Sequence, residues 1–482
     1  MKAPTHSLLE LSPNGRYLAF QYAETKEECI NYEGQISKYS KKCADQRKEY
    51  RAAYQMAIYD VTKKELTSLM PLPPDFYVNW FAWANDDRLL AAIRRRSTSN
   101  KKGSKISYGG SRIISLPRSG GDYITLFNDS RNMSRANFRI SSITSMLPND
   151  PNHVIIPAYK GDNLDLWKVN VNSGAYEQIA KGKVGTFSWM ADVNGKPLLR
   201  LDTTLLGRRV TVHAWNDETG KWENVRTIRT KRWNENEGLE FRPVATTDVA
   251  GQLVVVSDEE EGVRRAIKIY DYRKKDYVDT IYEHPLYDVG GAFINSATGE
   301  YAGAWYYDDR LQFEFEDKAW NSHFRGLNAF FDNASNLDIV STDKSGEKLV
   351  LLETSPNSPG DYYLYDRAQS NLEPIFSKTP DLAAAKFGTA EILETPTRDG
   401  ETVTAYVTHP ASGKNAVAPL LVMPHGGPEV RDYFDYDRTV QYFATRGYRI
   451  LQVNFRGSSG YGRPIRYAWL RRVGRGDAKR RH

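Results

Sequence analysis

The sequence predicts an all-β, seven-bladed propeller followed by an incomplete α/β layer. Two patterns predict this fold: a strand-and-turn unit that recurs about every 50 residues, and two apolar strands near the C-terminus with a helix between them. The composition agrees, because 12% of the 482 residues are aromatic and 26% are charged, as in a soluble, strand-rich protein. No run of 18 apolar residues occurs, so no membrane-spanning helix is expected.

The recurring unit is an apolar or aromatic strand that runs into an Asp or Asn turn and then into a second strand. Clear copies lie at 57–66, 166–174, 267–276 and 363–367, and weaker copies at 113–127, 212–222 and 312–317. The anchor positions, one for each unit, are Asp60, Leu116, Asn170, Asn216, Asp271, Glu316 and Asp366. Their intervals of 45 to 56 residues match propeller blades of four strands.

Tight turns of Gly, Asn or Asp also lead into strands at 11–20, 81–90 and 341–350. These turn residues are typical of β-hairpins. The drift in spacing is compatible with five to eight blades, and seven is the best count. A stacked array of β-sandwiches is the alternative fold. Its units would run nearer ~90–100 residues, so the shorter period favours the propeller.

The pattern changes near residue 385, and we therefore predict a propeller over 1–385 and a second domain over 386–462. A short linker at 381–386 precedes a hairpin of 392–396 and 402–409 around Arg398-Asp-Gly400. Residues 420–423 form an apolar run expected of a strand buried on both faces. A helix over 437–446 ends at Gly447, and another buried strand follows at 448–455.

Charge is concentrated in the last twenty residues. Residues 463–482 hold eight Lys or Arg and one acid, a net charge of +7, so the other 462 residues carry −1 of the total charge of +6. A neutral body does not attract phosphate strongly, so nucleic-acid binding is not expected. We interpret the segment as an aberrant basic tail, from a shifted reading frame or a truncated gene model.

The N-terminus and the cysteines are compatible with more than one cellular compartment. Residues 1–7 lack the apolar core of a secretory signal, so the protein is cytoplasmic as written, or periplasmic or secreted if a leader has been lost. Cys29 and Cys43 could close a disulfide in an oxidising compartment or stay free. No metal, calcium or phosphate motif occurs, and no cofactor is implied.

The first motif with chemical meaning is His425-Gly-Gly-Pro428, which follows the apolar run. Acyl transfer needs hydrogen-bond donors where the carbonyl oxygen becomes negative, and a glycine loop allows close approach of its backbone N–H groups. His425, Gly426 and Gly427 are therefore candidates for an oxyanion loop of the kind found in lipases and esterases. The alternative is an ordinary turn at the end of a strand.

The second motif is Asn454-Phe-Arg-Gly-Ser-Ser-Gly-Tyr-Gly462, a glycine-rich loop after the second strand. It does not fit G-x-G-x-x-G, so dinucleotide binding is poorly supported. Ser458 and Ser459 lack the G-x-S-x-G frame of a nucleophile and are interpreted as structural serines. Arg456 could orient an active-site carboxylate or cap backbone carbonyls, and we favour structural support of the active-site loop.

Together, the predicted propeller and these two motifs resemble the prolyl oligopeptidase family of serine peptidases, above all its acylaminoacyl-peptidase-like and dipeptidyl-peptidase-like branches. Arg398-Asp-Gly400 is similar to the family's turn at the entry to the catalytic domain. The resemblance implies an α/β-hydrolase domain with a Ser-Asp-His triad. It also implies a propeller that restricts entry to peptides or small acylated substrates.

The triad itself is absent from these 482 residues: no G-x-S-x-G occurs, and His482 is the only histidine after the second motif. The α/β-hydrolase domain is therefore expected to be incomplete, and the chain to be inactive as given, because an oxyanion loop needs a nucleophile and a base. The alternative function is a propeller module that binds a peptide or a protein and carries a vestigial hydrolase segment.

Overall fold

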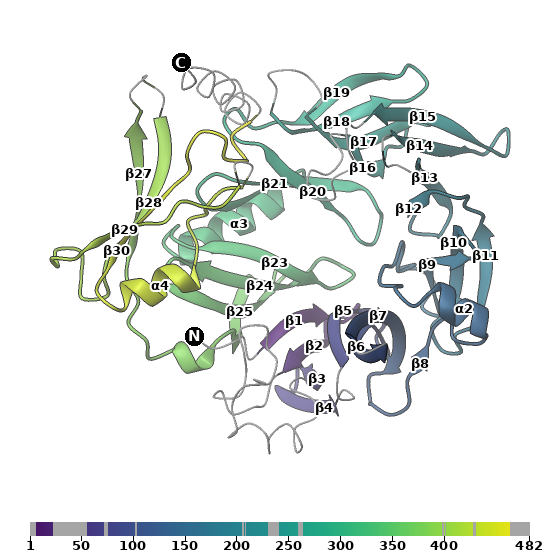
Figure 1. Cartoon of the computed structure of the whole chain (residues 1–482), viewed down its shortest axis with the longest axis horizontal. Coiled ribbons are helices and arrows are strands. Elements are labelled where there is room, and N and C mark those ends of the chain that lie inside the picture. Colours follow the sequence, from purple (N-terminus) through teal and green to yellow (C-terminus); the bar gives the residue numbers. More distant parts are fainter. Residues whose placement is uncertain are drawn as a thin grey trace.

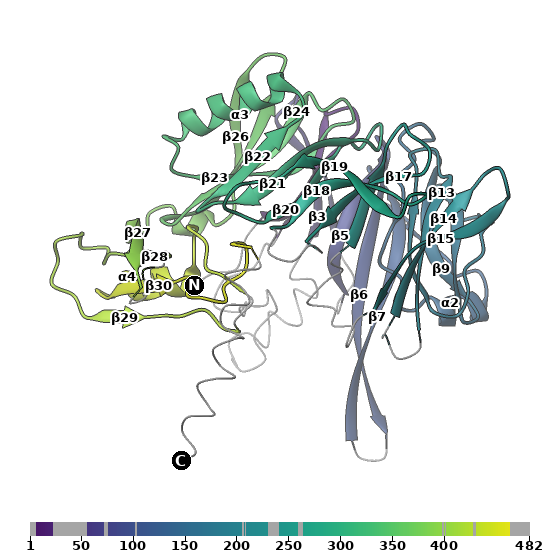
Figure 2. The same ribbon diagram turned by 90° about the horizontal axis from the view of Figure 1, so that it is seen from above.

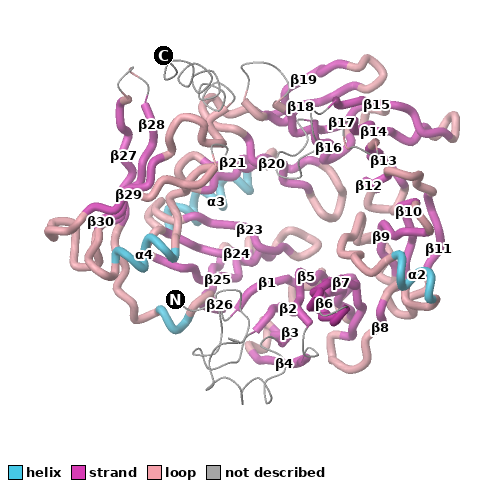
Figure 3. The backbone as a smooth tube through the Cα atoms, viewed as in Figure 1, coloured by secondary structure: helices cyan, strands magenta, loops and turns pink. Residues whose placement is uncertain are grey.

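The structure is a computed structural model that describes residues 6–22, 55–71, 76–101, 104–204, 207, 209–229, 241–258, 264–397, 400, 402–427 and 430–462. Strands dominate these residues, and the helices are short (Figure 3). The two cysteines and the basic tail lie outside the described residues. None of the described helices is long and apolar enough to cross a membrane.

In the described part of residues 6–377, seven antiparallel sheets follow one another and are arranged as a ring (Figure 1). The first contains β1 (His6–Leu11), β2 (Tyr17–Tyr22), β3 (Gln55–Asp60) and β4 (Glu65–Pro71). The second contains β5 (Phe76–Asn85), β6 (Arg88–Lys101), β7 (Ser104–Pro117) and β8 (Ile124–Thr125). After α2 (Arg131–Ala136), the third contains β9 (His153–Lys160), β10 (Asn163–Asn170) and β11 (Tyr176–Ala180).

The remaining four sheets complete the ring. The fourth contains β12 (Thr186–Ala191), β13 (Pro197–Thr203), β14 (Arg209–Asn216) and β15 (Lys221–Arg229). The fifth contains β16 (Phe241–Thr246), β17 (Gln252–Ser257), β18 (Ala266–Asp271) and β19 (Asp276–Tyr282). The sixth contains β20 (Val289–Ile294), β21 (Tyr301–Tyr307) and β22 (Leu311–Phe315), and α3 (Lys318–Phe330) follows it. The seventh contains β23 (Asn336–Thr342), β24 (Lys348–Ser355), β25 (Ser358–Asp366) and β26 (Asn371–Ser377).

The sequence repeat has a local cause in these sheets. Each of the seven predicted anchor positions falls in a different sheet, within or directly after one strand. At five of them an Asp or Asn side-chain oxygen accepts hydrogen bonds from backbone N–H groups two or three residues later: Asp60, Asn170, Asn216, Asp271 and Asp366. This bonding turns the chain tightly into the next strand, because the side chain stands in for a backbone acceptor.

The first and seventh sheets close the ring. Ser341 Oγ accepts a hydrogen bond from Leu11 N at 3.0 Å, and Lys344 N donates to Pro13 O at 3.0 Å. Phe20 of β2 and Tyr362 of β25 belong to one buried apolar cluster that spans the two sheets. The start and the end of the ring are therefore joined by both hydrogen bonds and apolar packing.

A last sheet follows the ring, after a 3₁₀ turn at Pro380–Leu382. It contains β27 (Ala390–Pro396), β28 (Thr402–Thr408), β29 (Leu420–Val422) and β30 (Arg449–Val453), in the order β27-β28-β30-β29. β29 and β30 are parallel, and α4 (Arg438–Ala444) connects them. We call it the terminal sheet. Figure 2 shows it at one end of the molecule, while the β6–β7 hairpin extends away from the ring.

Local signals placed the elements of the terminal sheet correctly. Asp437 caps α4, since its Oδ1 accepts from Thr439 N at 2.6 Å and from Val440 N at 2.9 Å. Gly447, three residues after α4, has φ +90°, a left-handed conformation that favours glycine. The predicted hairpin corresponds to β27 and β28, which pair antiparallel.

One expectation about this sheet was wrong. The apolar run at 420–423 was predicted to be buried on both faces, yet Leu420 is 58% exposed and Val422 is 54% exposed. The reason is its place in the sheet: among the described strands β29 pairs only with β30, so its other edge is open. An apolar run shows what a strand can bury, but its neighbours decide what it does bury.

Candidate functional site

The two sequence motifs meet at one edge of the terminal sheet. Residues 425–427 follow β29 and residues 454–462 follow β30, and parallel neighbours end at the same edge. His425 Nε2 lies 2.8 Å from Ser458 Oγ. The His425 ring stacks on Phe455, with centroids 4.3 Å apart and planes 14° apart. Two loops whose contacting residues, His425 and Ser458, are 33 positions apart in sequence thus form one structure.

Ser458 is a link between the loops and is inaccessible to a substrate. Its side chain is fully buried, and its hydroxyl donates to Phe455 O at 2.6 Å. Because the Ser458 proton is used there, Ser458 Oγ can accept from His425 Nε2–H, while His425 Nδ1 lies 3.2 Å from Gly426 O. This geometry favours the structural interpretation of Ser458 over a nucleophilic one.

The glycines beside His425 present backbone donors to open space. Gly426 and Gly427 are exposed, and their N–H groups have no hydrogen-bond partner among the described residues. A Cβ atom added to Gly426 would meet no atom within 4 Å. Gly427 has φ +54°, which a residue with a side chain rarely adopts. The loop therefore keeps two N–H groups free for a ligand oxygen, as an oxyanion site requires.

Sequence reasoning missed a polar cluster behind this loop. Asp432 N donates to Asn454 Oδ1 at 2.8 Å, and Asn454 Nδ2 donates to Asp432 O at 3.0 Å. Asp432 Oδ2 is buried and has no hydrogen-bond partner within the described part of the chain. Burial raises the pKa of the Asp432 carboxyl, and the nearby His425 opposes this shift. Asp432 gave no signal in the sequence, because it belongs to no motif.

Known proteins resemble this chain in both sequence and fold. No protein-family model matches the chain. Dipeptidyl aminopeptidase BIII of Pseudoxanthomonas mexicana is 25% identical over 337 residues, which cover 67% of this chain and 47% of the relative. The solved acylaminoacyl peptidase of Pyrococcus horikoshii aligns over 98% of this chain and 68% of its own, with a TM-score of 0.59 and 13% identity. A solved prolyl endopeptidase aligns over 97% of this chain and 63% of its own, with a TM-score of 0.54 and 12% identity.

These relatives and structural neighbours are dipeptidyl, acylaminoacyl and prolyl peptidases, so the comparisons support the predicted resemblance to the prolyl oligopeptidase family. The chain spans about half the length of the curated relative described above.

Arg456 lies in the second loop and is half-buried. Its support of the active-site loop stays a prediction, as do the oxyanion roles of His425, Gly426 and Gly427. In the described ranges, no group of three or more His, Cys, Asp or Glu side chains could hold a metal ion.

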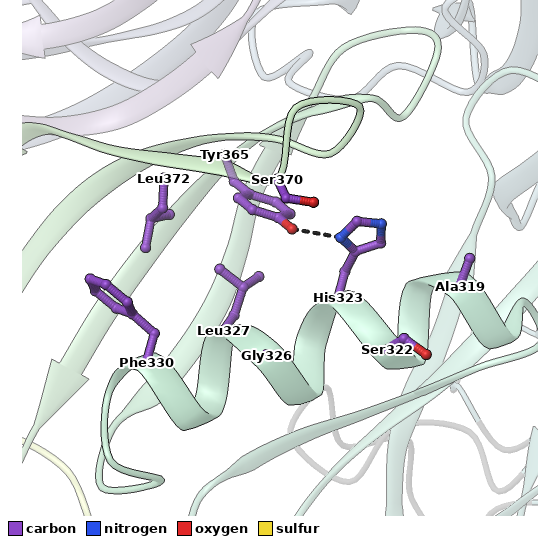
Figure 4. Close-up of a pocket in the computed structure, with 9 residues that line it drawn as sticks. All are labelled: Ala319, Ser322, His323, Gly326, Leu327, Phe330, Tyr365, Ser370 and Leu372. Atoms are coloured by element: carbon purple, nitrogen blue, oxygen red, sulfur yellow. Dashed lines mark hydrogen bonds between the residues drawn. The ribbon is translucent and has the colours of Figure 1, made fainter.

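A separate pocket of about 600 Å³ lies between α3 and the β25–β26 hairpin (Figure 4). His323 and Tyr365 point toward each other across it, with His323 Nδ1 2.6 Å from the Tyr365 hydroxyl. Leu327, Phe330 and Leu372 form its apolar end. None of the residues that line this pocket belongs to the loops of the terminal sheet, so it is not part of the candidate site.

Proposed function

We propose that this chain provides the substrate-admitting and oxyanion-binding parts of a serine-type peptidase that hydrolyses peptide bonds in small peptides. In this proposal residues 1–385 are a seven-bladed β-propeller, and residues 386–462 are the N-terminal part of an α/β-hydrolase domain. The observation that carries the proposal is the pair of free N–H groups at Gly426 and Gly427.

The arrangement of the sheets supports this division. Seven consecutive sheets in a ring are what a seven-bladed propeller requires, and β29, α4 and β30 form the strand–helix–strand unit of an α/β layer. The relatives are named as dipeptidyl, acylaminoacyl and prolyl peptidases, which all act on peptides. Peptides are therefore the proposed substrates or ligands here.

The proposed mechanism is stabilisation of the negative charge that develops on a peptide carbonyl oxygen. When a nucleophile attacks a peptide carbonyl, its oxygen becomes negative, and donors already aimed at that position lower the barrier. Gly426 and Gly427 would supply two such donors, and the stack of His425 on Phe455 together with the bond to Ser458 would hold the loop still. No G-x-S-x-G occurs in the sequence. We therefore propose that the 482-residue chain alone does not turn peptides over.

The oxyanion role is tested with a product-like peptide. A carboxylate oxygen mimics the developing oxyanion, so the purified chain should bind an acetylated dipeptide with a free carboxylate better than its amide. Replacing Gly426→Pro removes one N–H group and should weaken carboxylate binding at least tenfold in calorimetry. Gly426→Ala keeps the N–H group and is the matched control, since the added Cβ meets open space. Equal binding by both variants would contradict the proposal.

A fluorophosphonate probe tests the absence of turnover. The probe reacts with activated serines, and no labelling of the 482-residue chain is expected, because Ser458 is buried. Stoichiometric labelling of Ser458 would reverse this conclusion. The second candidate function, a propeller module that binds a peptide or a protein, is favoured if peptides bind equally well to the Gly426→Pro variant.

A further inference from the structure

The ring holds the segment that follows the candidate oxyanion loop. Arg431 is only 4% exposed, and its Nη2 donates to Asp308 O at 2.7 Å. Its Nη1 points at Tyr307 O, 3.4 Å away. Tyr307 is the last residue of β21, and Asp308 is the first residue of the turn between β21 and β22 in the sixth sheet. The guanidinium of the terminal part of the chain is thus bound by main-chain oxygens of the ring.

Two further hydrogen bonds fix the same segment to the ring. Phe434 N donates to Asp309 O at 3.2 Å. Asn336 Nδ2, at the start of β23, donates to Phe434 O at 3.0 Å. Residues 431–434 are therefore attached to the sixth and seventh sheets at several points, directly after the loop that contains Gly426 and Gly427.

The same guanidinium also holds the second loop. Arg431 Nη2 donates to the Tyr461 hydroxyl at 2.9 Å, and the guanidinium carbon lies 4.4 Å from the centre of the Tyr461 ring. The Tyr461 hydroxyl accepts another hydrogen bond, from Asn454 Nδ2 at 3.0 Å. Asn454 in turn holds the main chain of Asp432. Arg431 therefore lies between the ring and the loop whose Ser458 contacts His425.

Arginine suits this position for a geometric reason. Its planar guanidinium carries five N–H donors in fixed directions, so it can bond to two carbonyls and a hydroxyl at the same time. A lysine ammonium of similar reach is a compact charge and cannot bridge acceptors that far apart. Space around the guanidinium is also restricted: a Cβ atom on Gly460 would lie 2.9 Å from Arg431 Nη1.

We propose that Arg431 is a positioning residue, through which the β21–β22 turn of the ring fixes the candidate oxyanion loop 425–427. The role of the loop rests on the proposed function, whereas the contacts of Arg431 do not. A shift of the β21–β22 turn is passed through Arg431 to Tyr461, Asn454 and Asp432, and from this loop to His425. The ring therefore controls the position of the N–H groups of Gly426 and Gly427.

Hydrogen exchange tests this coupling in the full 482-residue chain. In Arg431→Met, the amides of Asp432, Ser458 and Ser459 should exchange at least tenfold faster, because their bonds depend on the two loops keeping their places. The His425 Nε2–H signal in NMR spectra should broaden or shift as the bond to Ser458 loosens. Amides of β13 and β14 in the fourth sheet should not change.

Controls separate positioning from general stability. Arg446→Met removes an exposed guanidinium near α4, which contacts Tyr442, and should leave the exchange of the loops unchanged. Arg431→Lys should behave like Arg431→Met. Added ethylguanidinium should restore slow exchange to an Arg431→Ala variant, whereas ethylammonium should not, because only the former reproduces the fork of donors.

A second pair of variants tests the same contact without touching Arg431. Gly460→Ala and Gly447→Ala both place a side chain at a left-handed residue, with φ +87° and +90°. Only the Cβ of Gly460 reaches the guanidinium, since that of Gly447 meets open space. Gly460→Ala should therefore reproduce the faster exchange of the loops, and Gly447→Ala should not.

Unchanged exchange of the loops in Arg431→Met would overturn the inference, and so would an equal increase in the loops and in β13 and β14. Failure of the proposed function is a different result. In that case the exchange data would still show the coupling, while Gly426→Pro would leave the binding of the peptide carboxylate unchanged.

Discussion

Glu10 shows how one residue can make the stability of the ring depend on pH. It lies on β1, and its Oε2 accepts a hydrogen bond from Ser341 Oγ of β23 at 3.0 Å, where the ring closes. Burial raises the pKa of Glu10 to about 7, and the bond from Ser341 opposes this shift. Because the folded-state pKa lies above the unfolded value, folding favours the protonated carboxyl. The cost of ionising Glu10 is therefore absent at acidic pH and complete above about pH 7.

Glu10→Gln should remove this pH dependence. At pH 8 the variant should be more stable than the wild type by up to about 3 kcal/mol, while at pH 4 the two should be equal. Urea unfolding at both values of pH measures the difference. Glu177→Gln, at an exposed position on β11, is the control and should have no effect at either pH. An equal effect of Glu10→Gln at pH 4 and pH 8 would show that ionisation is not the cause.

Ser458 carries a second prediction at this scale. Ser458→Ala removes the hydroxyl that bonds to both Phe455 O and His425, while Phe455 O keeps its hydrogen bond from the Ser458 backbone N–H. We expect a loss of about 1 kcal/mol in the free energy of unfolding of the terminal sheet, measured by urea titration. The neighbouring Ser459→Ala should cost less, because its side chain is only half-buried. Equal costs would argue against the link through His425.

At the scale of elements, the turns at the ends of the repeated strands explain why the repeat was visible in the sequence. Asn170 ends β10, and its Oδ1 accepts from Asn172 N at 2.9 Å and from Ser173 N at 3.0 Å. Such a turn needs only a side-chain acceptor a few residues before its donors, so sequence proximity is sufficient. The exposed face of β29 could not be predicted in this way, because the number of strands beside it is not a local property.

We predict that the side-chain oxygen of Asn170 stabilises the turn after β10. Asn170→Ala should destabilise the third sheet by about 1 kcal/mol, because two backbone N–H groups lose their acceptor. Asn170→Asp keeps an oxygen in the same place and should cost less. Thermal unfolding of both variants measures the difference. If Asn170→Asp is as costly as Asn170→Ala, the side-chain oxygen is not what holds the turn.

At the scale of the whole molecule, one set of contacts closes the ring and a different set attaches the terminal sheet to it. The ring closes through Leu11, Ser341 and Lys344, all within residues 6–377. The contacts that attach the terminal sheet to the ring include those of Arg431 and Phe434 with the sixth and seventh sheets. Asp288 N also donates to Gly460 O at 2.9 Å, and Gln441 Nε2 donates to Pro356 O at 2.7 Å. Closure of the ring therefore does not need the terminal sheet, whereas the position of the terminal sheet needs the ring.

A fragment that ends at residue 385 should accordingly fold by itself. Each sheet packs mainly on its neighbours, and the contacts that close the ring are all retained. We expect a β-rich circular dichroism spectrum and a cooperative thermal transition within a few degrees of that of the ring in the full chain. An unfolded or aggregated fragment would show that the terminal sheet is part of the folding unit.

The sequence by itself determined the recurring strand-and-turn unit, the strand–helix–strand order near the C-terminus and the two glycine loops. These features depend on residues close together in the chain, whose spacing and turn chemistry act locally. Only the tertiary structure decided that His425 meets Ser458, 33 residues away, and that Arg431 meets Asp308, 123 residues away. His425 meets Ser458 because β29 and β30 pair, and Arg431 meets Asp308 because the terminal sheet packs on the ring, so no local pattern encodes either contact.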